Sequence, residues 1–331
     1  MKKRERLEKT QSGELVDRMP VALWRHWPGD DQRIADFVWS TLTFQKTFDW
    51  DFVKVTPFSA YCVTDYGVQT EWRGEIGGDR TPTKYPVKRS LAWTELRTLD
   101  PLRGEQGKHI EAIRLIGEEL QTLDTPFVTT IYSPLTQASM LAGGNLLLRH
   151  LRTRTDRLRT ALNIITENTL RFIDALRRTH IAGIFYEMHH ADFTLMSEEE
   201  YRSLSTPYDL KILGELPSKW WLNFSHLPGN APMFALATSY QSQGISWDSH
   251  NAKPSIDRAR AINQNVLCGG VCRETHLHRG TPAMIRDVAR EIADRAGTRR
   301  LVLAAGGAVP VSTPLANLRA MRDIADELRM S

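Results

Sequence analysis

The sequence is poor in cysteine and has no long hydrophobic run. Its 331 residues include only three cysteines, Cys62, Cys268 and Cys272. So few thiols, and an odd number of them, exclude a disulfide framework and are typical of a reducing compartment. No apolar run approaches the ~20 residues of a bilayer-spanning helix, and no signal-peptide core follows the charged start. We therefore predict a soluble, cytoplasmic protein with free thiols and no membrane association.

Neither sign of charge dominates. The 43 lysines and arginines are interspersed with 39 acidic residues, which leaves a net charge of +4. The arginine-rich segment Arg149–Arg159 has the spacing of a solvated helix face. We therefore predict no nucleic-acid binding, and a site for an anionic small molecule explains the mild positive balance equally well.

The chain contains no internal repeat of fixed period. Short apolar runs with the length of buried strands alternate instead with segments of helical periodicity. These runs are Phe52–Pro57, Phe127–Tyr132, Gly183–His189, Trp220–His226, Gly244–Asp248, Asn265–Val271 and Arg300–Ala305. This order predicts an α/β fold, a (β/α)₈ TIM barrel over residues 18–331, preceded by a charged N-terminal helical arm over residues 1–17.

Several helices are marked by local signals. The segment Ser197–Glu200 has the spacing of a capping box and predicts a helix through Tyr201–Gly214. Asn145–His180 predicts one long helix or two joined ones, and Thr281–Ala296 and Pro314–Met330 predict the last barrel helices. The Gly/Pro/Lys-rich tract Gly74–Lys88 has no apolar period and predicts a loop or short hairpin over the barrel mouth.

Titratable residues stand at the ends of several predicted strands. Strand alternation sends Glu187 and His189 to one face, where they would form an acid/base pair, metal ligands or a salt bridge at the rim. His226 ends a second strand, and Asp248 and His250 end a third. Because catalytic residues of barrel enzymes lie at the carboxyl ends of strands, we predict catalytic roles for His226, Glu187, His189 and Asp248.

The same residues suggest a metal site. His226, Glu187 and Asp248 would form an N/O ligand set that suits zinc, iron or manganese. Cys268 and Cys272, with His276 and His278, resemble a zinc set, but a shared metal would require the chain to fold back sharply. In the alternative, Cys268 is a core residue and Cys272 is a thiol that lines the site.

Basic residues and glycines provide candidate substrate contacts. Arg25 and His26 lie in a loop between Trp24 and Trp27, where arginine would bind carboxylate or phosphate, or where the indoles only pack the loop down. Lys54 interrupts a strand, so it must be paired or face the cavity. Gly306-Gly307 brings backbone amides close to a ligand just before a helix start. The predicted substrate contacts are Arg25, His26, Lys54, Cys272, Arg273, Gly306 and Gly307.

Several segments, in this order, resemble the uroporphyrinogen decarboxylase family, which includes the corrinoid-protein methyltransferases. They are Asp51–Pro57, Ser133–Thr136 with Leu141–Gly143, Met196–Tyr201 with Pro207–Asp209, Leu222–Gly229, Ile245–Asp248, Cys268–Arg273 and Gly306–Asn317. The resemblance covers roughly residues 18–330. It implies a (β/α)₈ barrel with its site at the carboxyl face, and it makes a homodimer plausible.

The resemblance also shows where this chain departs from the family pattern. Arg25 matches the first substrate-binding arginine of the decarboxylases, whereas the second arginine, the tyrosine and the late histidine fall at Gly29, Met140 and Gly307. The methyltransferases hold zinc with a His-x-Cys pair and a later cysteine. Here the pair reads His226-Leu227-Pro228 and the later cysteine again falls at Gly307. Only one zinc ligand is retained.

Three functions follow from the resemblance. The first is methyl transfer between a small molecule and a corrinoid protein or thiol, with a divalent metal such as zinc or a partner-borne corrinoid as cofactor. The second is decarboxylation of uroporphyrinogen or a related tetrapyrrole carboxylate. The third is a barrel that binds a tetrapyrrole or corrinoid without turnover. The clustered titratable residues argue against this third function.

Overall fold

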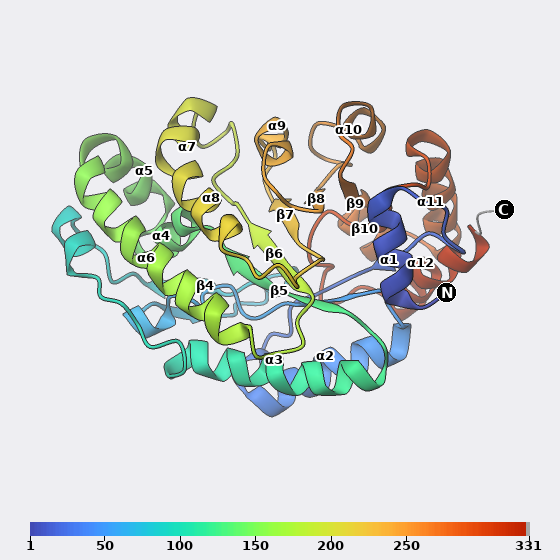
Figure 1. Cartoon of the computed structure of the whole chain (residues 1–331), viewed down its shortest axis with the longest axis horizontal. Coiled ribbons are helices and arrows are strands. Elements are labelled where there is room, and N and C mark those ends of the chain that lie inside the picture. Colours follow the sequence, from blue (N-terminus) through green and yellow to red (C-terminus); the bar gives the residue numbers. More distant parts are fainter. Residues whose placement is uncertain (329–331) are drawn as a thin grey trace.

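The computed structural model describes residues 1–328, and its core is a barrel of eight parallel strands surrounded by helices (Figure 1). The strand order is β1-β10-β9-β8-β7-β6-β5-β2, and β3 and β4 form a separate antiparallel hairpin. The predicted barrel is therefore confirmed. The strands are β1 (Val21–Ala22), β2 (Val53–Val55), β3 (Gln69–Glu71), β4 (Thr81–Lys84), β5 (Phe127–Tyr132), β6 (Gly183–Glu187), β7 (Phe224–Leu227), β8 (Gly244–Trp247), β9 (Val266–Val271) and β10 (Leu301–Ala305).

Long helices cover the outside of the barrel, and four short helical turns lie in loops. The helices are α1 (Lys3–Ser12), α2 (Ile34–Phe48), α3 (Gly104–Thr122), α4 (Pro134–Ala142), α5 (Gly144–Thr153), α6 (Thr155–Leu176), α7 (Glu198–Leu204), α8 (Thr206–Gly214), α9 (Phe234–Thr238), α10 (Ile256–Ile262), α11 (Pro282–Ala296) and α12 (Leu315–Glu327). The turns are η1 (Asp30–Gln32), η2 (Thr64–Tyr66), η3 (Ser90–Glu95) and the π-helical η4 (Arg273–His278). Among residues 1–328, no helix combines the length and apolar character needed to cross a bilayer.

Helix boundaries agree with the prediction in one segment and differ in another. The Asn145–His180 segment forms two helices, α5 and α6, which meet at Arg154, as one of the two predicted alternatives has it. The capping box at Ser197 is present, but the helix that it starts ends at Leu204, and α8 begins anew with Pro207 in its first turn. Proline cannot supply the amide that would continue the helix, which explains the break. The predicted end of the last helix, at Met330, lies outside the described residues.

Strand β1 was not predicted from the sequence, because a strand of two residues is too short to show the alternation of apolar and polar side chains. Val21 pairs with Leu303 of β10, and its carbonyl accepts a hydrogen bond from the Asp51 amide just before β2. The Asp51 carboxylate in turn accepts from the Val21 amide at 2.8 Å and from Arg18 at 2.7 Å. A buried carboxylate thus joins β1 to β2, where the sheet order begins and ends.

The N-terminal arm closes the amino end of the barrel. Leu7 of α1 is buried among the side chains that fill the barrel interior, including Phe52 and Phe224. Arg6 donates hydrogen bonds to Asp51 at 2.7 Å and to Asp17. The predicted arm is therefore helical. It covers the amino ends of the strands and inserts Leu7 into the barrel interior, and in this sense α1 plugs the barrel.

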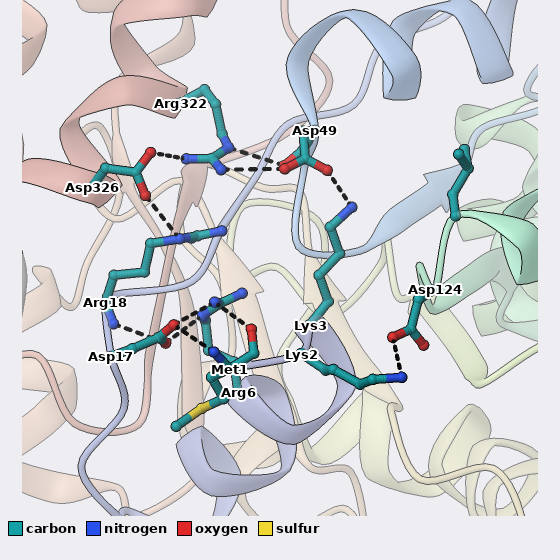
Figure 2. A pocket seen from close by; sticks show the side chains of 11 residues that line it. Met1, Lys2, Lys3, Arg6, Asp17, Arg18, Asp49, Asp124, Arg322 and Asp326 are labelled. Carbon is teal, nitrogen blue, oxygen red and sulfur yellow. Dashed lines mark hydrogen bonds and ion pairs between the residues drawn. The ribbon is translucent and has the colours of Figure 1, made fainter.

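Charged side chains surround a cavity of about 610 Å³ at this amino end (Figure 2). Lys3 pairs with Asp49, Arg322 links Asp49 to Asp326, and Lys2 pairs with Asp124. Arg18 also reaches Asp326 of α12. Because each basic group here already has a carboxylate partner, this cavity joins α1 and α12 to the barrel, and the described residues around it leave no free cation for a ligand.

We expect Leu7→Ala to lower the free energy of unfolding by about 2–5 kcal/mol, because it opens a cavity inside the barrel. Leu15→Ala is the matched control, since Leu15 is 53% exposed and Leu7 only 1%. We expect the control to change stability by less than ~0.5 kcal/mol. Urea denaturation measures both. Equal effects of the two substitutions would show that α1 does not plug the barrel in solution.

The tract Gly74–Lys88 forms part of a hairpin, as predicted. Its carbonyl at Ile76 accepts a hydrogen bond from the Val311 amide at 2.8 Å, and Asp79 pairs with His26 at 3.2 Å. Gly78, at φ +81°, packs so closely that a Cβ would lie 2.7 Å from that of His26. The hairpin is thus fastened across the carboxyl end of the barrel.

Candidate active site

A cavity of about 250 Å³ opens at the carboxyl ends of the barrel strands. Many of its lining residues are titratable, in contrast to the apolar barrel interior beneath it. It is lined by Trp24, His26, Lys54, Thr56, Ser59, Asp79, Tyr132, Glu187, His189, His226, Pro228, Gly229, Asn230, Asp248, Asn251, Ala252, Arg273, Gly306, Gly307 and Ala308.

A buried ion pair lies at this cavity. Lys54 Nζ donates to Glu187 Oε1 at 2.8 Å, and the two side chains are 4% and 8% exposed. The ammonium also lies 4.5 Å from the ring centroid of Phe185 and 5.3 Å from that of Trp24, which gives it cation–π contacts. Burial alone would raise the Glu187 pKa, but Lys54 and the neighbouring histidines outweigh it and hold the pKa well below its usual value. Lys54 is thus both paired and part of the cavity wall.

His226 is held in a tautomer that suits a base. Its Nδ1 lies 3.1 Å from the carbonyl oxygen of Ser246, in the neighbouring strand β8. Because a carbonyl only accepts hydrogen bonds, Nδ1 carries the proton and a neutral ring keeps its lone pair on Nε2. Nε2 lies 3.7 Å from Glu187 Oε2. Burial lowers the His226 pKa to about 4, so the ring is neutral near pH 7.

We expect His226 to make the fold sensitive to acid. An unfolded histidine titrates near 6.5 and folded His226 near 4, so the unfolded state binds more protons between these values. The stability that the neutral ring contributes is therefore present above pH ~6.5 and is lost as pH falls toward 4, by up to roughly 3 kcal/mol. Melting temperatures measured from pH 7 to pH 4 should fall less steeply in His226→Asn. Parallel curves would refute a lowered pKa.

His189 brings a second imidazole to the same carboxylate. Its Nε2 lies 3.3 Å from Glu187 Oε2, and its ring packs edge-on against Tyr132. The side chain is 40% exposed, unlike that of His226. The predicted alternation therefore places Glu187 and His189 in one cavity, while Met188 is buried in the outer core.

Asp248 lines the cavity but turns toward its own loop. Its carboxylate accepts from the Asn251 amide at 3.1 Å and from the Asn251 side chain at 2.9 Å. Gly306 packs against it, because a Cβ at Gly306 would lie 2.3 Å from the Asp248 Cα. His250, predicted with Asp248, instead packs against His276 and does not line this cavity.

The metal sets predicted from the sequence are not assembled. Within residues 1–328, no three His, Cys, Asp or Glu side chains are grouped so that they could hold a metal ion. His226 and Glu187 lie together without Asp248, and Lys54 occupies one oxygen of Glu187. Pro228 and Gly307 offer no side-chain ligand atom. The donor set around His226 therefore does not fit the zinc that the resemblance implies.

The second predicted set has other partners. Cys268 is buried in β9, and burial raises its pKa to about 12. His276 Nδ1 accepts from the Cys272 amide, while His278 bonds to Ser312. Cys272 is buried behind Asn251, whose side chain lies 3.6 Å from its sulfur. Cys272 does not line the mouth cavity, contrary to its predicted substrate contact.

Arg273 is the arginine that lines the cavity. Its side chain is 37% exposed, and the one carboxylate within 4 Å among the described residues is Glu274, at 3.9 Å. A Cβ at Gly307 would lie 3.2 Å from Arg273 Nη1, so the missing side chain at Gly307 leaves room for the guanidinium. Arg273 therefore presents a weakly paired cation to a ligand.

Arg25 points away from this cavity. Its Nη2 donates to the Val311 carbonyl at 2.7 Å, and its guanidinium lies 4.8 Å from the Trp27 ring centroid. His26 does line the cavity, where it meets Asp79 of the hairpin. The predicted loop thus contributes His26 and Trp24, while Arg25 fastens the loop to the segment after β10.

Sequence reasoning missed several residues of this wall, among them Asp79, Tyr132, Asn230 and Asn251. Asp79 lies in the hairpin that was predicted to cover the barrel mouth, and this position could have indicated that Asp79 lines the cavity. The hydrogen bond with the His26 imidazole outweighs burial and lowers the Asp79 pKa. Tyr132 ends a correctly predicted strand, but its hydroxyl carries no local signature.

The fold and this cavity define a parallel (β/α)₈ barrel with a polar cavity at the carboxyl ends of its strands. Residues 74–328 match the family model described as Uroporphyrinogen decarboxylase (URO-D), and the chain belongs to this family. The predicted family is therefore confirmed. A search of curated proteins returned no match.

Solved structures support the same fold. A methyltransferase from Methanosarcina mazei has a TM-score of 0.86 and 22% identity, with 99% of each chain covered. A B12-independent methionine synthase from Shewanella sp. W3-18-1, in complex with selenomethionine, has a TM-score of 0.56 and 12% identity, with 95% of this chain and 96% of that chain covered. A putative vitamin-B12 independent methionine synthase from Listeria monocytogenes has a TM-score of 0.54 and 13% identity, covering 99% and 94%. At these identities the likeness concerns the fold.

Proposed function

We propose that this protein is a methyltransferase that binds a small acceptor at the barrel mouth and removes its proton with His226. The observation that carries the proposal is the tautomer of His226, which keeps a lone pair on Nε2 beside the Glu187 carboxylate. A neutral imidazole has a lone pair that can accept a proton at neutral pH, and the Glu187 carboxylate beside Nε2 stabilises the imidazolium that then forms. The fold of the Methanosarcina mazei methyltransferase supports methyl transfer as the reaction class.

The proposed reaction has two steps. The bond between the acceptor atom and its hydrogen breaks, the electron pair stays on the acceptor, and the proton goes to His226 Nε2. The acceptor then forms a bond to the methyl carbon, and the electron pair of the old methyl bond stays with the donor. The donor is a methylated corrinoid carried by a partner protein, or a methylated thiol.

Fixed charges around the base have separate roles. Glu187 stabilises the imidazolium that forms on His226, because its oxygen lies 3.7 Å from Nε2. Lys54 keeps that carboxylate ionised, and its positive charge favours the deprotonated acceptor. Arg273 binds an anionic group on the substrate, since its guanidinium is only weakly paired.

Decarboxylation of a tetrapyrrole is less well supported. Such a substrate carries many carboxylates, and only two of the lysines and arginines within residues 1–328, Lys54 and Arg273, line the mouth cavity. Lys54 is already paired with Glu187, and Arg25 points elsewhere. The mouth cavity itself, at about 250 Å³, lies at the small end for ligand cavities, which favours a small reacting group beside His226.

The test is a methyl-transfer assay with methylcobalamin as donor and a panel of small thiols, amines and phenols as acceptors. The visible spectrum follows demethylation, and mass spectrometry identifies the methylated product. We expect one acceptor class to be methylated only when the protein is present, and equally well after dialysis against EDTA. Failure with every acceptor, both with methylcobalamin and with methyl thioether donors, would overturn the proposal.

A further inference from the structure

A second cavity of about 400 Å³ adjoins the mouth cavity. The two cavities share His189, Pro228, Gly229 and Asn230. The second one extends outward between α4, the start of α5 and the loop after β6. Its other walls include Met140, Gly144, Asn145, Leu148, His190 and Asp192.

The start of α5 offers free amide donors at this cavity. The first hydrogen bond of this ten-residue helix runs from the Leu147 amide to the Gly143 carbonyl, so the amides of Gly144 to Leu146 have no intrahelical partner. No side chain caps them. Gly144 and Asn145 line the cavity, so the positive end of the helix dipole lies at its wall.

His190 gives an independent sign of a ligand. Its side chain lines the cavity and is buried, with only 5% of the residue exposed. Its Nδ1 has no hydrogen-bond partner among residues 1–328. A buried polar atom without a protein partner is unfavourable unless a water, an ion or another bound molecule satisfies it. Met140, Leu148 and Leu195 add apolar wall beside these polar groups.

The acidic residue of the cavity is already engaged. The Asp192 carboxylate accepts from the Thr194 amide and hydroxyl at 2.6 Å and from the Ala231 amide at 3.1 Å. Gly229 packs against it, because a Cβ there would lie 1.8 Å from its oxygen. Asp192 thus fastens the loops after β6 and β7 together, whereas the first amides of α5 and the His190 Nδ1 have no partner among residues 1–328.

We propose that the second cavity binds a carboxylate on a short aliphatic chain, which is the remote part of the acceptor whose reactive atom lies beside His226. Free helix amides bind the carboxylate, and the apolar wall contacts the aliphatic chain. The link to the acceptor rests on the proposed function, whereas carboxylate binding in this cavity does not. The substrate class is therefore a short carboxylic acid with a nucleophilic heteroatom at its other end.

The test is binding of butyrate to the full chain, measured by saturation-transfer NMR and isothermal titration, with butanamide as the uncharged probe. Gly144→Pro removes one amide donor at the first helical position, where proline is well tolerated. Gly144→Ala keeps the amide and is the matched control, because a Cβ at this position meets nothing within 4 Å. Met140→Trp places a larger side chain in the apolar part of the cavity and leaves every α5 amide in the chain.

We expect butyrate to bind more tightly than butanamide, with about a tenfold loss in Gly144→Pro, no loss in Gly144→Ala and no detectable binding in Met140→Trp. Equal binding of the two probes, or equal affinities of the proline and alanine variants, would overturn the carboxylate site. Because no turnover is measured, this result is independent of the methyl-transfer assay. Butyrate binding without any methyl transfer would refute the proposed function alone.

Discussion

His226→Asn should lower the rate of methyl transfer by about 10²- to 10⁴-fold, the usual contribution of a general base. Asparagine keeps a donor near the position of Nδ1 for the Ser246 carbonyl and lacks the basic Nε2 that faces Glu187. The loss should appear in kcat at saturating acceptor, since the acceptor still meets Arg273 and the cavity wall. Initial rates in the methylcobalamin assay measure it.

The matched control for this experiment is His250→Asn. His250 follows the neighbouring strand β8, is exposed, and does not line the mouth cavity. It should therefore retain the wild-type rate. A wild-type rate in His226→Asn, or the same loss in both variants, would show that His226 is not the base.

Lys54→Met should lower the free energy of unfolding by about 3–5 kcal/mol, because it leaves the Glu187 carboxylate buried without its ammonium partner. This is a large part of the roughly 5–15 kcal/mol by which domains are stable. Glu187→Gln should be similarly costly, because it leaves the ammonium of Lys54 unpaired. Urea denaturation at pH 7 measures both variants and the double variant.

The double variant shows whether the loss of stability in each single variant comes from breaking the interaction between Lys54 and Glu187. Removing both charges should cost less than the sum of the single losses, with a coupling energy of at least about 2 kcal/mol. The exposed pair Lys46–Glu119, at 3.4 Å and about half exposed on both sides, is the control. Lys46→Met should cost less than ~1 kcal/mol. Additive losses at Lys54 and Glu187 would refute a coupled buried pair.

Much of the barrel was predictable because strand and helix periods are local properties. Two strands, Phe127–Tyr132 and Gly183–Glu187, are buried along their whole length, and their mostly apolar residues indicate this burial in the sequence itself. Strand β1 has two residues and depends on pairing with β10, so its own sequence had no pattern to show. The helix after Ser197 was predicted too long, because a local proline break was read as continuous periodicity.

The candidate site was predictable only in part. Because strands in a barrel end at one face, position alone placed Glu187, His189 and His226 near one another. The direction in which each side chain points could not be predicted from its position in the sequence. Arg25 turns to the Val311 carbonyl, and Asp248 turns to Asn251, although each stands where a substrate or metal contact was expected.

The sequence by itself determined the barrel, seven of its eight parallel strands, the family, and the face on which titratable residues gather. These follow from hydrophobic period and from motifs whose residues are close in the chain. Only the tertiary structure decided that Lys54 pairs with Glu187 across 133 residues, that Ser246 fixes the tautomer of His226, and that α1 plugs the barrel. Such contacts depend on strand register and side-chain direction, which distant parts of the chain impose on one another.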